Sequence, residues 1–362
     1  MSRLLALCSA AALLVFAASA SNAHAEDSGR TLAVTMTNDP VSNQIQVYDT
    51  STKVLLQTLS TDGKGGVAGS ARGVKQFKGE LVAAVNNGSN TVALYRRQGD
   101  RLTFDKLVTT TSAPVSVDFG NDHMYVAGAT TVDSFVIDGD HVEWRDGTTS
   151  LELAGGVPPP SGSTSQVGVI DRRHLLVSLK NDPDPGTVDV VMLDDGTVAA
   201  AAPDAVLAPA GTLTPFGFAV YPDGTALVTL AHSSQAGLFR NGAFTAVIAV
   251  GQTADCWMTR VGKYVFTANT GSGTLSRLIG TGNHVFVDNP VAASIATGGA
   301  PADIDAQAGV LGVIDGGAGQ SHLSLFTYNE FGELAASGAP ITLGVPNADG
   351  VAIMALADRE GH

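Results

Sequence analysis

Cysteine is nearly absent from this 362-residue chain, which contains only Cys8 and Cys256. Cys8 lies in an N-terminal segment that we expect to be removed, so the finished protein can form no internal disulfide. Its fold must therefore depend on a large buried core. Cys256 stands beside Trp257 in an apolar context, with no neighbour in the sequence that would lower its pKa. We expect a buried thiol rather than a nucleophile.

Several catalytic and binding signatures are also missing. The sequence has no G-x-S-x-G, C-x-x-C, H-E-x-x-H or P-loop motif, and its histidines show no metal-ligand spacing. This argues against a serine hydrolase, a zinc enzyme and an NTPase. Basic residues are few, with 20 Lys and Arg against 34 Asp and Glu and a net charge of −14. We therefore expect no binding to nucleic acid or to an anionic membrane surface.

The N-terminus has the features of a secretory signal peptide. Arg3 is the only charge before Glu26, Leu4–Ala20 is apolar or small, and Ala23–Ala25 reads Ala-His-Ala. This order predicts cleavage after Ala25 and a periplasmic or secreted protein. No other stretch is long and apolar enough to be inserted in a membrane.

A repeated pattern fills the rest of the chain, residues 26–362, and no apolar segment has a helical period of useful length. In Glu80–Tyr95 and Lys263–Leu278, an apolar strand, an Asn/Gly/Ser turn and a second apolar strand follow one another. Seven copies start about every 40–50 residues, the period of a β-propeller with four strands per blade. The strand before the turn, which is the second strand of its blade, lies at Leu32–Thr35, Leu81–Val85, Met124–Ala127, Leu175–Leu179, Ala226–Leu230, Tyr264–Ala268 and Val310–Ile314.

The first and last copies complement each other. Six copies are preceded by a further strand, whereas Arg30 leads directly into Leu32–Thr35. The segment Asn347–Met354 looks like this missing strand, with no blade after it. We therefore predict a single all-β, seven-bladed propeller, closed by a C-terminal strand that completes the N-terminal blade.

The repeat resembles that of the lactonase-type, 3-carboxymuconate cyclase-like and YVTN-repeat seven-bladed propellers. The resemblance rests on Val85–Tyr95 (VNNGSNTVALY), Thr267–Leu278 (TANTGSGTLSRL) and Thr214–Thr229 (TPFGFAVYPDGTALVT). It implies the propeller fold, and it implies a lactonase or cycloisomerase as one class of activity. Catalytic members typically have Pro-His-Gly at the start of a blade, and none of the seven openings here contains His. The resemblance therefore assigns no catalytic residue.

Candidate site residues follow from propeller topology. The loops before each first strand and those after each second strand share one face, around the mouth of the central channel. In blades six, seven and one the openings place an Asp after an Ala, and blade two follows with an Arg. The candidates for catalysis are Arg72, Asp255, Asp303, Asp349 and His232, and those for substrate binding are Asn38, Asn86, Lys180, Asn269 and Asp315.

Carboxylates beside an arginine could serve three purposes. One carboxylate could act as general base on a lactone while Arg72 stabilises the oxyanion, the group could hold Ca²⁺, or it could bind a polar ligand without chemistry. The simpler alternative is that each Asp caps a turn. We predict no cofactor, and Ca²⁺ stays an open alternative, here and at the acidic turn Asn181–Gly186.

The absence of His from the openings favours a binding protein over an enzyme. We expect a monomeric exported propeller that binds a small molecule or another exported protein at the channel mouth. The alternative is a lactonase-like hydrolase or cycloisomerase that acts on a lactone or a sugar acid. Because propellers host many unrelated activities, the fold alone does not choose between them.

Overall fold

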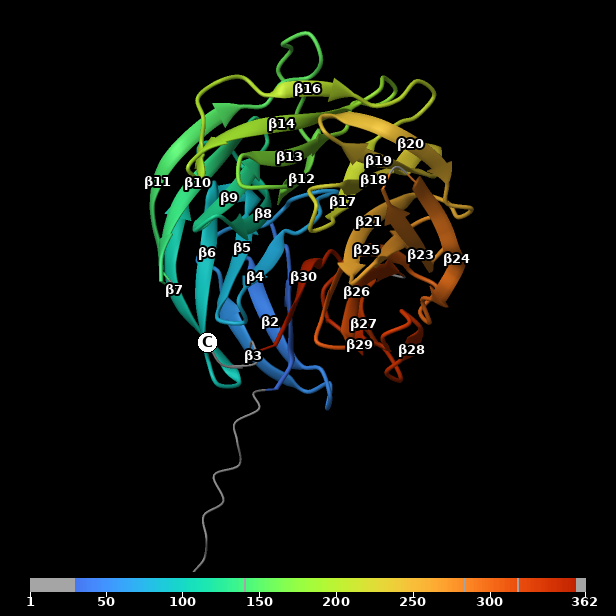
Figure 1. Cartoon of the computed structure of the whole chain (residues 1–362). Coiled ribbons are helices and arrows are strands. Elements are labelled where there is room, and N and C mark those ends of the chain that lie inside the picture. Colours follow the sequence, from blue (N-terminus) through green and yellow to red (C-terminus); the bar gives the residue numbers. More distant parts are fainter. Residues whose placement is uncertain (1–29, 140, 283, 318, 356–362) are drawn as a thin grey trace, which may run out of the picture.

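The computed structural model of the protein describes residues 30–139, 141–282, 284–317 and 319–355. The expected signal peptide, residues 1–25, lies outside this part. Seven antiparallel sheets follow one another around a ring, which confirms the predicted seven-bladed propeller (Figure 1). Two single 3₁₀ turns follow the second strands of blades two and five, η1 (Asn87–Ser89) and η2 (Ala231–Ser233).

Each blade is a sheet of four or five strands, and blades two to seven use consecutive stretches of chain. Blade two comprises β4 (Val74–Phe77), β5 (Leu81–Asn86), β6 (Thr91–Gln98) and β7 (Arg101–Thr109). Blade three comprises β8 (Pro114–Gly120), β9 (His123–Gly128), β10 (Thr131–Asp138) and β11 (His141–Ser150). Blade four comprises β12 (Thr164–Val169), β13 (His174–Leu179), β14 (Thr187–Asp194), β15 (Thr197–Val198) and β16 (Asp204–Leu207).

The remaining consecutive blades are five, six and seven. Blade five comprises β17 (Pro215–Val220), β18 (Ala226–Leu230), β19 (Gln235–Arg240) and β20 (Ala243–Ala249). Blade six comprises β21 (Asp255–Val261), β22 (Tyr264–Asn269), β23 (Thr274–Thr281) and β24 (His284–Ser294). Blade seven comprises β25 (Ala300–Gln307), β26 (Val310–Gly317), β27 (Gln320–Tyr328), β28 (Leu334–Ala336) and β29 (Ile341–Thr342). Its outer strand is split into β28 and β29, and Pro340 between the two pieces has no N–H for the ladder.

Blade one joins the two ends of the chain. It comprises β1 (Leu32–Met36), β2 (Gln44–Asp49), β3 (Leu55–Ser60) and β30 (Asp349–Met354). β30 pairs with β1 in antiparallel register, with Leu32 opposite Met354 and Thr35 opposite Val351. The predicted closure by the C-terminal strand is therefore confirmed.

The core lies between neighbouring blades. The first strand of each blade lies nearest the channel and the last lies at the rim (Figure 1). The second strands are covered on both faces by adjacent blades, and every residue of β5, β9 and β22 is buried. This double coverage explains why these strands read as continuous apolar runs rather than as alternating patterns.

Side chains of the first strands also connect one blade to the next. Gln166 of blade four exchanges two 2.9 Å hydrogen bonds with the backbone of Phe218 in blade five. At the closure, the backbone N–H groups of Val351, Ile353 and Ala355 donate to blade seven. Their acceptors are Asp303 (3.1 Å), Asp305 (2.8 Å) and Gln307 (3.1 Å). This ladder of three hydrogen bonds attaches the C-terminal strand to the preceding blade.

Candidate functional site

The long connection between β3 and β4 is the feature that shapes the channel mouth. We call residues 61–73 of this connection the plug. Five of these thirteen residues are glycine, and none belongs to a strand. In Figure 1 the plug, coloured blue, runs from β3 into the middle of the ring, toward β12 and β17. A long connection without regular structure in a compact domain is usually functional.

Consecutive residues of the plug contact different blades. The N–H of Ala71 donates to the carbonyl of Ser165 in blade four (2.9 Å). The indole N–H of Trp257 in blade six donates to the carbonyl of Ser70 (2.6 Å), and the Ser70 hydroxyl donates to Asp349 in blade one (2.9 Å). Because these blades lie on different sides of the ring, the plug spans the mouth of the channel.

Asn38, a predicted ligand-binding residue, holds the plug in place. Its side-chain oxygen accepts from the N–H groups of Gly66 (2.7 Å) and Val67 (3.0 Å). Its amide nitrogen donates to the carbonyl of Val67 (2.8 Å). The structure therefore places Asn38 at the mouth, where its side chain is already bonded to the plug.

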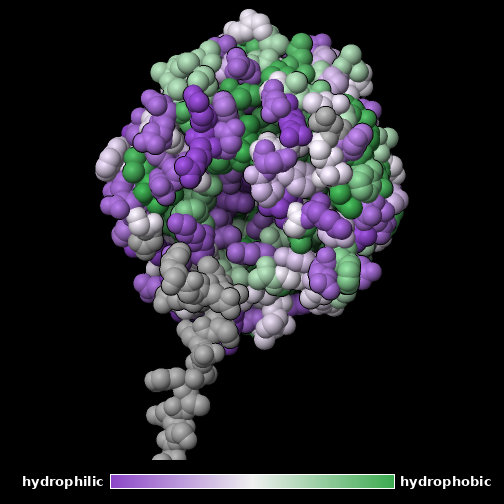
Figure 2. All heavy atoms as spheres, viewed as in Figure 1, coloured by the Kyte–Doolittle hydropathy of each residue, from purple (hydrophilic) through white to green (hydrophobic). Residues whose placement is uncertain are grey.

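A pocket of about 450 Å³ remains beside the plug. Its walls come from the plug and from blades one, six and seven, and we call it the mouth pocket. Figure 2 shows that the centre of the ring is hollowed and that hydrophilic residues surround the hollow. The lining includes Asn38, Val67, Trp257, Ser321, Pro346 and Asp349.

Asp349 is the ionisable residue in the lining of the mouth pocket, and 7% of its surface is exposed. Burial raises the pKa of Asp349 to about 6, while hydrogen bonds from Ser70 and Gly350 and the charge of Lys180 oppose that shift. A carboxyl with this pKa changes its charge just below neutral pH. It can therefore exchange a proton with a bound ligand.

Lys180 is the cation whose charge acts on Asp349. Its ammonium group donates to the carbonyl of Gly69 (2.8 Å) and lies 4.9 Å from the centre of the Phe216 ring. Burial lowers the pKa of Lys180, while Cys256, Asp182 and Asp349 oppose that shift. The predicted ligand-binding Lys180 therefore contributes positive charge to this side of the mouth.

Arg72 has a different partner from the one expected. Its guanidinium lies 3.5 Å from the carboxylate of Asp118 in blade three and 6.0 Å from the ring centre of Phe218. Its backbone has a φ of 60°, a left-handed conformation within the plug. The structure therefore pairs Arg72 with Asp118, and it gives Arg72 no contact with Asp255, Asp303 or Asp349.

The three aspartates from equivalent openings do not form one cluster. Asp303 accepts from the N–H groups of Ile304 (2.9 Å) and Val351 (3.1 Å), so its carboxyl belongs to the closure ladder. Burial, together with the charge of Asp349, raises the pKa of Asp303 well above its ordinary value. Asp255 is fully buried, neither of its oxygens has a partner in the described part of the chain, and burial raises its pKa strongly. Only Asp349 borders the mouth pocket.

Three further candidates at the ends of second strands bond to nearby turns and strands, and none of these three lines the mouth pocket. Asn86 donates to the carbonyl of Thr61 (3.1 Å), and Asn269 donates to the Ser276 hydroxyl (2.8 Å). Asp315 accepts from the Thr297 hydroxyl (2.6 Å). All three side chains are fully buried, and their contacts hold turns and neighbouring strands in place.

His232 lies on the blade-five side of the mouth, away from the lining of the mouth pocket. Its side chain is exposed, and its Nδ1 contacts the carboxylate of Asp182, which also accepts from Thr214 (2.6 Å). The acidic turn Asn181–Gly186 thus supplies a partner for His232. Among the described residues, no group of three or more His, Cys, Asp or Glu is arranged to hold a metal ion.

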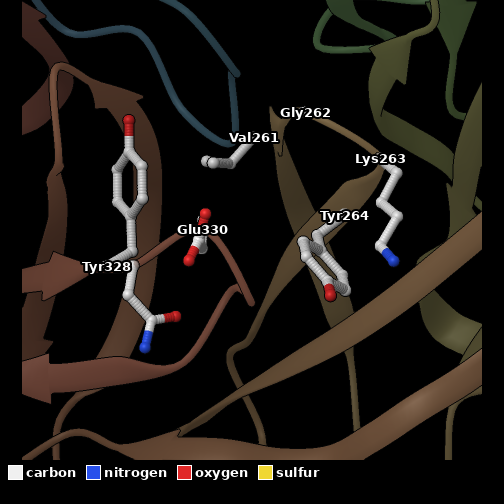
Figure 3. A pocket seen from close by; sticks show the side chains of 7 residues that line it. Val261, Gly262, Lys263, Tyr264, Tyr328 and Glu330 are labelled. Atoms are coloured by element: carbon white, nitrogen blue, oxygen red, sulfur yellow. The ribbon is translucent and has the colours of Figure 1, made fainter.

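A second pocket of about 450 Å³ lies on the opposite face, between the turns of blades six and seven. Figure 3 shows Tyr264, Tyr328, Lys263 and Glu330 around it. Nearby, Arg277 donates to the carbonyl of Phe331 (3.0 Å), the residue that follows Glu330. None of the predicted site residues lines this pocket, and its ionisable groups stand at exposed turns. We therefore take the mouth pocket as the candidate site.

The plug itself was not predicted from the sequence. The available signal was the length and glycine content of residues 61–73, compared with the four-residue connection 110–113 between blades two and three. In the sequence Trp257 stands out only as a neighbour of Cys256, although its indole both lines the pocket and binds the plug. None of the helical segments in the described residues is long and apolar enough to cross a membrane.

Comparison with known proteins finds similarity in structure only. No protein-family model matches the sequence, and no curated protein is detectably similar to it. A protein from Lactobacillus plantarum superposes with a TM-score of 0.64 at 18% identity, covering 90% of this chain and 99% of its own. A protein from Bacteroides uniformis, proposed to be a 6-phosphogluconolactonase, has a TM-score of 0.63 at 14% identity, with coverage of 90% and 99%.

A third structure is the periplasmic gluconolactonase of Pseudomonas aeruginosa, with a TM-score of 0.61 at 16% identity. It covers 91% of this chain and 99% of its own. The expected resemblance to lactonase-type propellers is therefore confirmed for the fold. At such low identity the likeness assigns no activity to this chain.

Proposed function

We propose that the mouth pocket binds a small, oxygen-rich molecule of the sugar-acid or lactone class. The observation that carries this proposal is Asp349, a buried carboxyl with a pKa of about 6 in the wall of a pocket of about 450 Å³. Such a volume suits a small-molecule ligand. Asp349 can accept hydrogen bonds from ligand hydroxyls, and the ammonium of Lys180 can attract a ligand carboxylate. The gluconolactonases among the similar structures support this ligand class.

The binding test uses isothermal titration calorimetry with D-gluconate. We expect the wild-type chain to bind it and Asp349→Asn to bind it at least tenfold more weakly, because the amide carries no charge and donates where the carboxylate accepts. Asp171→Asn is the matched control, since Asp171 pairs with His174 away from the mouth and should leave binding unchanged. Equal affinity of wild type and Asp349→Asn would contradict the assignment.

A second candidate function is the hydrolysis of a lactone, and the pKa of Asp349 favours it. An ionised Asp349 can take a proton from a water that attacks the lactone carbonyl carbon, while Lys180 stabilises the developing oxyanion. The tetrahedral intermediate then breaks the ring C–O bond, and the proton passes to the leaving oxygen.

This mechanism predicts a dependence on pH. Since the base must be ionised, hydrolysis of D-glucono-1,5-lactone should rise as the pH increases through about 6, the pKa of Asp349. Asp349→Asn should lower the enzymatic rate by about 10²–10⁴-fold, measured in a pH-stat after subtraction of the spontaneous reaction. A rate that equals the spontaneous one at every pH would leave binding as the function.

We also propose that the protein is exported and acts as a monomer in the periplasm or outside the cell. The Ala-His-Ala sequence at Ala23–Ala25 supports this proposal. N-terminal sequencing of the protein from a bacterial host should find Glu26 as the first residue. If calorimetry finds no small ligand, the same face would be tested for an exported protein partner by affinity capture.

A further inference from the structure

Three polar side chains of the mouth are occupied by two successive plug residues. Lys180 donates to the carbonyl of Gly69 (2.8 Å) and Trp257 donates to the carbonyl of Ser70 (2.6 Å). The Ser70 hydroxyl donates to Asp349 (2.9 Å). These side chains come from blades four, six and one, so they converge from separate parts of the ring on one short piece of backbone.

We propose that the plug is an internal occupant of the ligand site, and that a ligand binds where the plug now lies. The inference rests on the proposed function. The carbonyls of Gly69 and Ser70 and the hydroxyl of Ser70 mark positions for two acceptor oxygens and one hydroxyl. A hydroxy acid or a hydroxy lactone carries these groups on neighbouring carbons. The plug therefore both defines the ligand class and keeps the site closed in the free protein.

The composition of the plug suits a segment that undocks. Gly66 and Gly69 have φ angles of 95° and 59°, so the chain bends at both positions. Only Val67 and Ala71 bury apolar side chains there, with 6% and 2% exposed. The contacts of the plug with Asn38, Lys180, Trp257 and Asp349 are hydrogen bonds, which water or a ligand can replace.

The two ends of the plug have partners other than the three mouth side chains. Arg72 stays attached to Asp118 at 3.5 Å, and the Asn86 amide holds the carbonyl of Thr61 at 3.1 Å. The intervening residues can therefore leave the mouth as a loop while blades one and two remain in place. A site that opens only part of the time binds its ligand with an apparent affinity reduced by the open fraction.

Gly65→Ala provides a way to weaken docking from outside the ligand contacts. A Cβ on Gly65 would lie 2.4 Å from the carbonyl carbon of Asn38, so the docked plug would have to shift. Gly99→Ala is the control for backbone strain away from the plug. Gly99 lies in the turn between β6 and β7 with a φ of 61°, and a Cβ there meets nothing within 4 Å, so the change strains a distant turn and leaves the plug untouched.

The experiment combines hydrogen exchange of residues 61–73, followed by mass spectrometry, with calorimetric titration of D-gluconate. Wild type should show faster exchange of the plug amides when gluconate is saturating. Gly65→Ala should show fast exchange without gluconate and should bind gluconate about tenfold more tightly, while Gly99→Ala should behave as wild type. Tight binding to Gly65→Ala with none to wild type would also support the inference.

The experiment distinguishes a failure of this inference from a failure of the proposed function. If gluconate binds to wild type with unchanged or slower plug exchange, the ligand sits beside a docked plug. That result would overturn this inference and leave the proposed function standing. If neither wild type nor Gly65→Ala binds gluconate, the proposed function and the inference fail together. The exchange experiment on wild type needs no variant, so poor folding of Gly65→Ala does not remove the test.

Discussion

A chain that stops at Pro346, and so lacks β30, is expected not to fold into a soluble monomer. All six residues of β30 are buried. Full burial of Val351, Ile353 and Met354 contributes about 5–9 kcal/mol at about 1.5–3 kcal/mol for each side chain. That sum is comparable to the whole stability of a typical domain, about 5–15 kcal/mol. The truncation also exposes the edge of β1, a template for aggregation.

Circular dichroism and size-exclusion chromatography would measure this effect. A synthetic peptide of residues 347–355, added during refolding, should restore the β signal and the monomer, because it can re-form the ladder with Asp303, Asp305 and Gln307. The control peptide carries Ile353→Asp, which places a charge at a position with 0% exposure. Cooperative unfolding of the truncated chain at the wild-type temperature would show that closure is dispensable.

The stability of the protein is expected to fall as the pH rises from about 4.5 to 8. Asp189 of blade four is fully buried, and burial raises its pKa to about 7 against the hydrogen bonds from Glu152 and Thr187. In the unfolded chain this pKa returns to about 3.9. Between about pH 3.9 and about pH 7, the two pKa values, the folded protein holds a proton on Asp189 that the unfolded chain has lost. The stabilisation from this proton is fully present below the unfolded pKa and is lost as the pH rises through the folded pKa.

The size of this effect follows from the difference in pKa. One pKa unit corresponds to about 1.4 kcal/mol, so Asp189 alone should lower the free energy of unfolding by on the order of 3 kcal/mol between pH 4.5 and 8. Burial of Asp349, with a pKa of about 6, adds a loss of the same sign. Below about pH 4 the trend should reverse, because carboxylates such as Asp39 have a pKa lowered by backbone N–H groups.

Urea unfolding at pH 4.5, 6 and 8 would measure the slope. Asp189→Asn removes this titrating group and should reduce the slope, while the contribution of Asp349 remains. Asp223→Asn is the control, because the pKa of Asp223 shifts in the opposite direction: the N–H of Thr225 lowers the pKa of this exposed carboxyl. It should leave the slope between pH 4.5 and 8 unchanged. A wild-type stability that is level or rises over this range would refute the prediction.

The sequence by itself determined the ring. Each blade is a local pattern of apolar strands and polar turns, so its strands can be located from neighbouring residues alone. The missing first strand at Arg30 and the surplus strand at Asn347–Met354 even predicted how the ring closes. The blades could be located because hairpin pairing depends on short sequence separations, and the closure could be predicted because one copy of the repeat lacks the strand that the last segment supplies.

The tertiary structure decided what the site is. Equivalent positions in the repeat suggested that Asp255, Asp303 and Asp349 act together, yet their carboxyls have three different environments. The position of a residue in the repeat specifies its backbone conformation. The environment of its side chain is specified by the segment that packs against it, which can come from a distant part of the sequence. Here that segment is the plug, which belongs to none of the repeated strands. Its contacts with Lys180 and Trp257 join residues more than a hundred positions apart, so they could be found only in the folded ring.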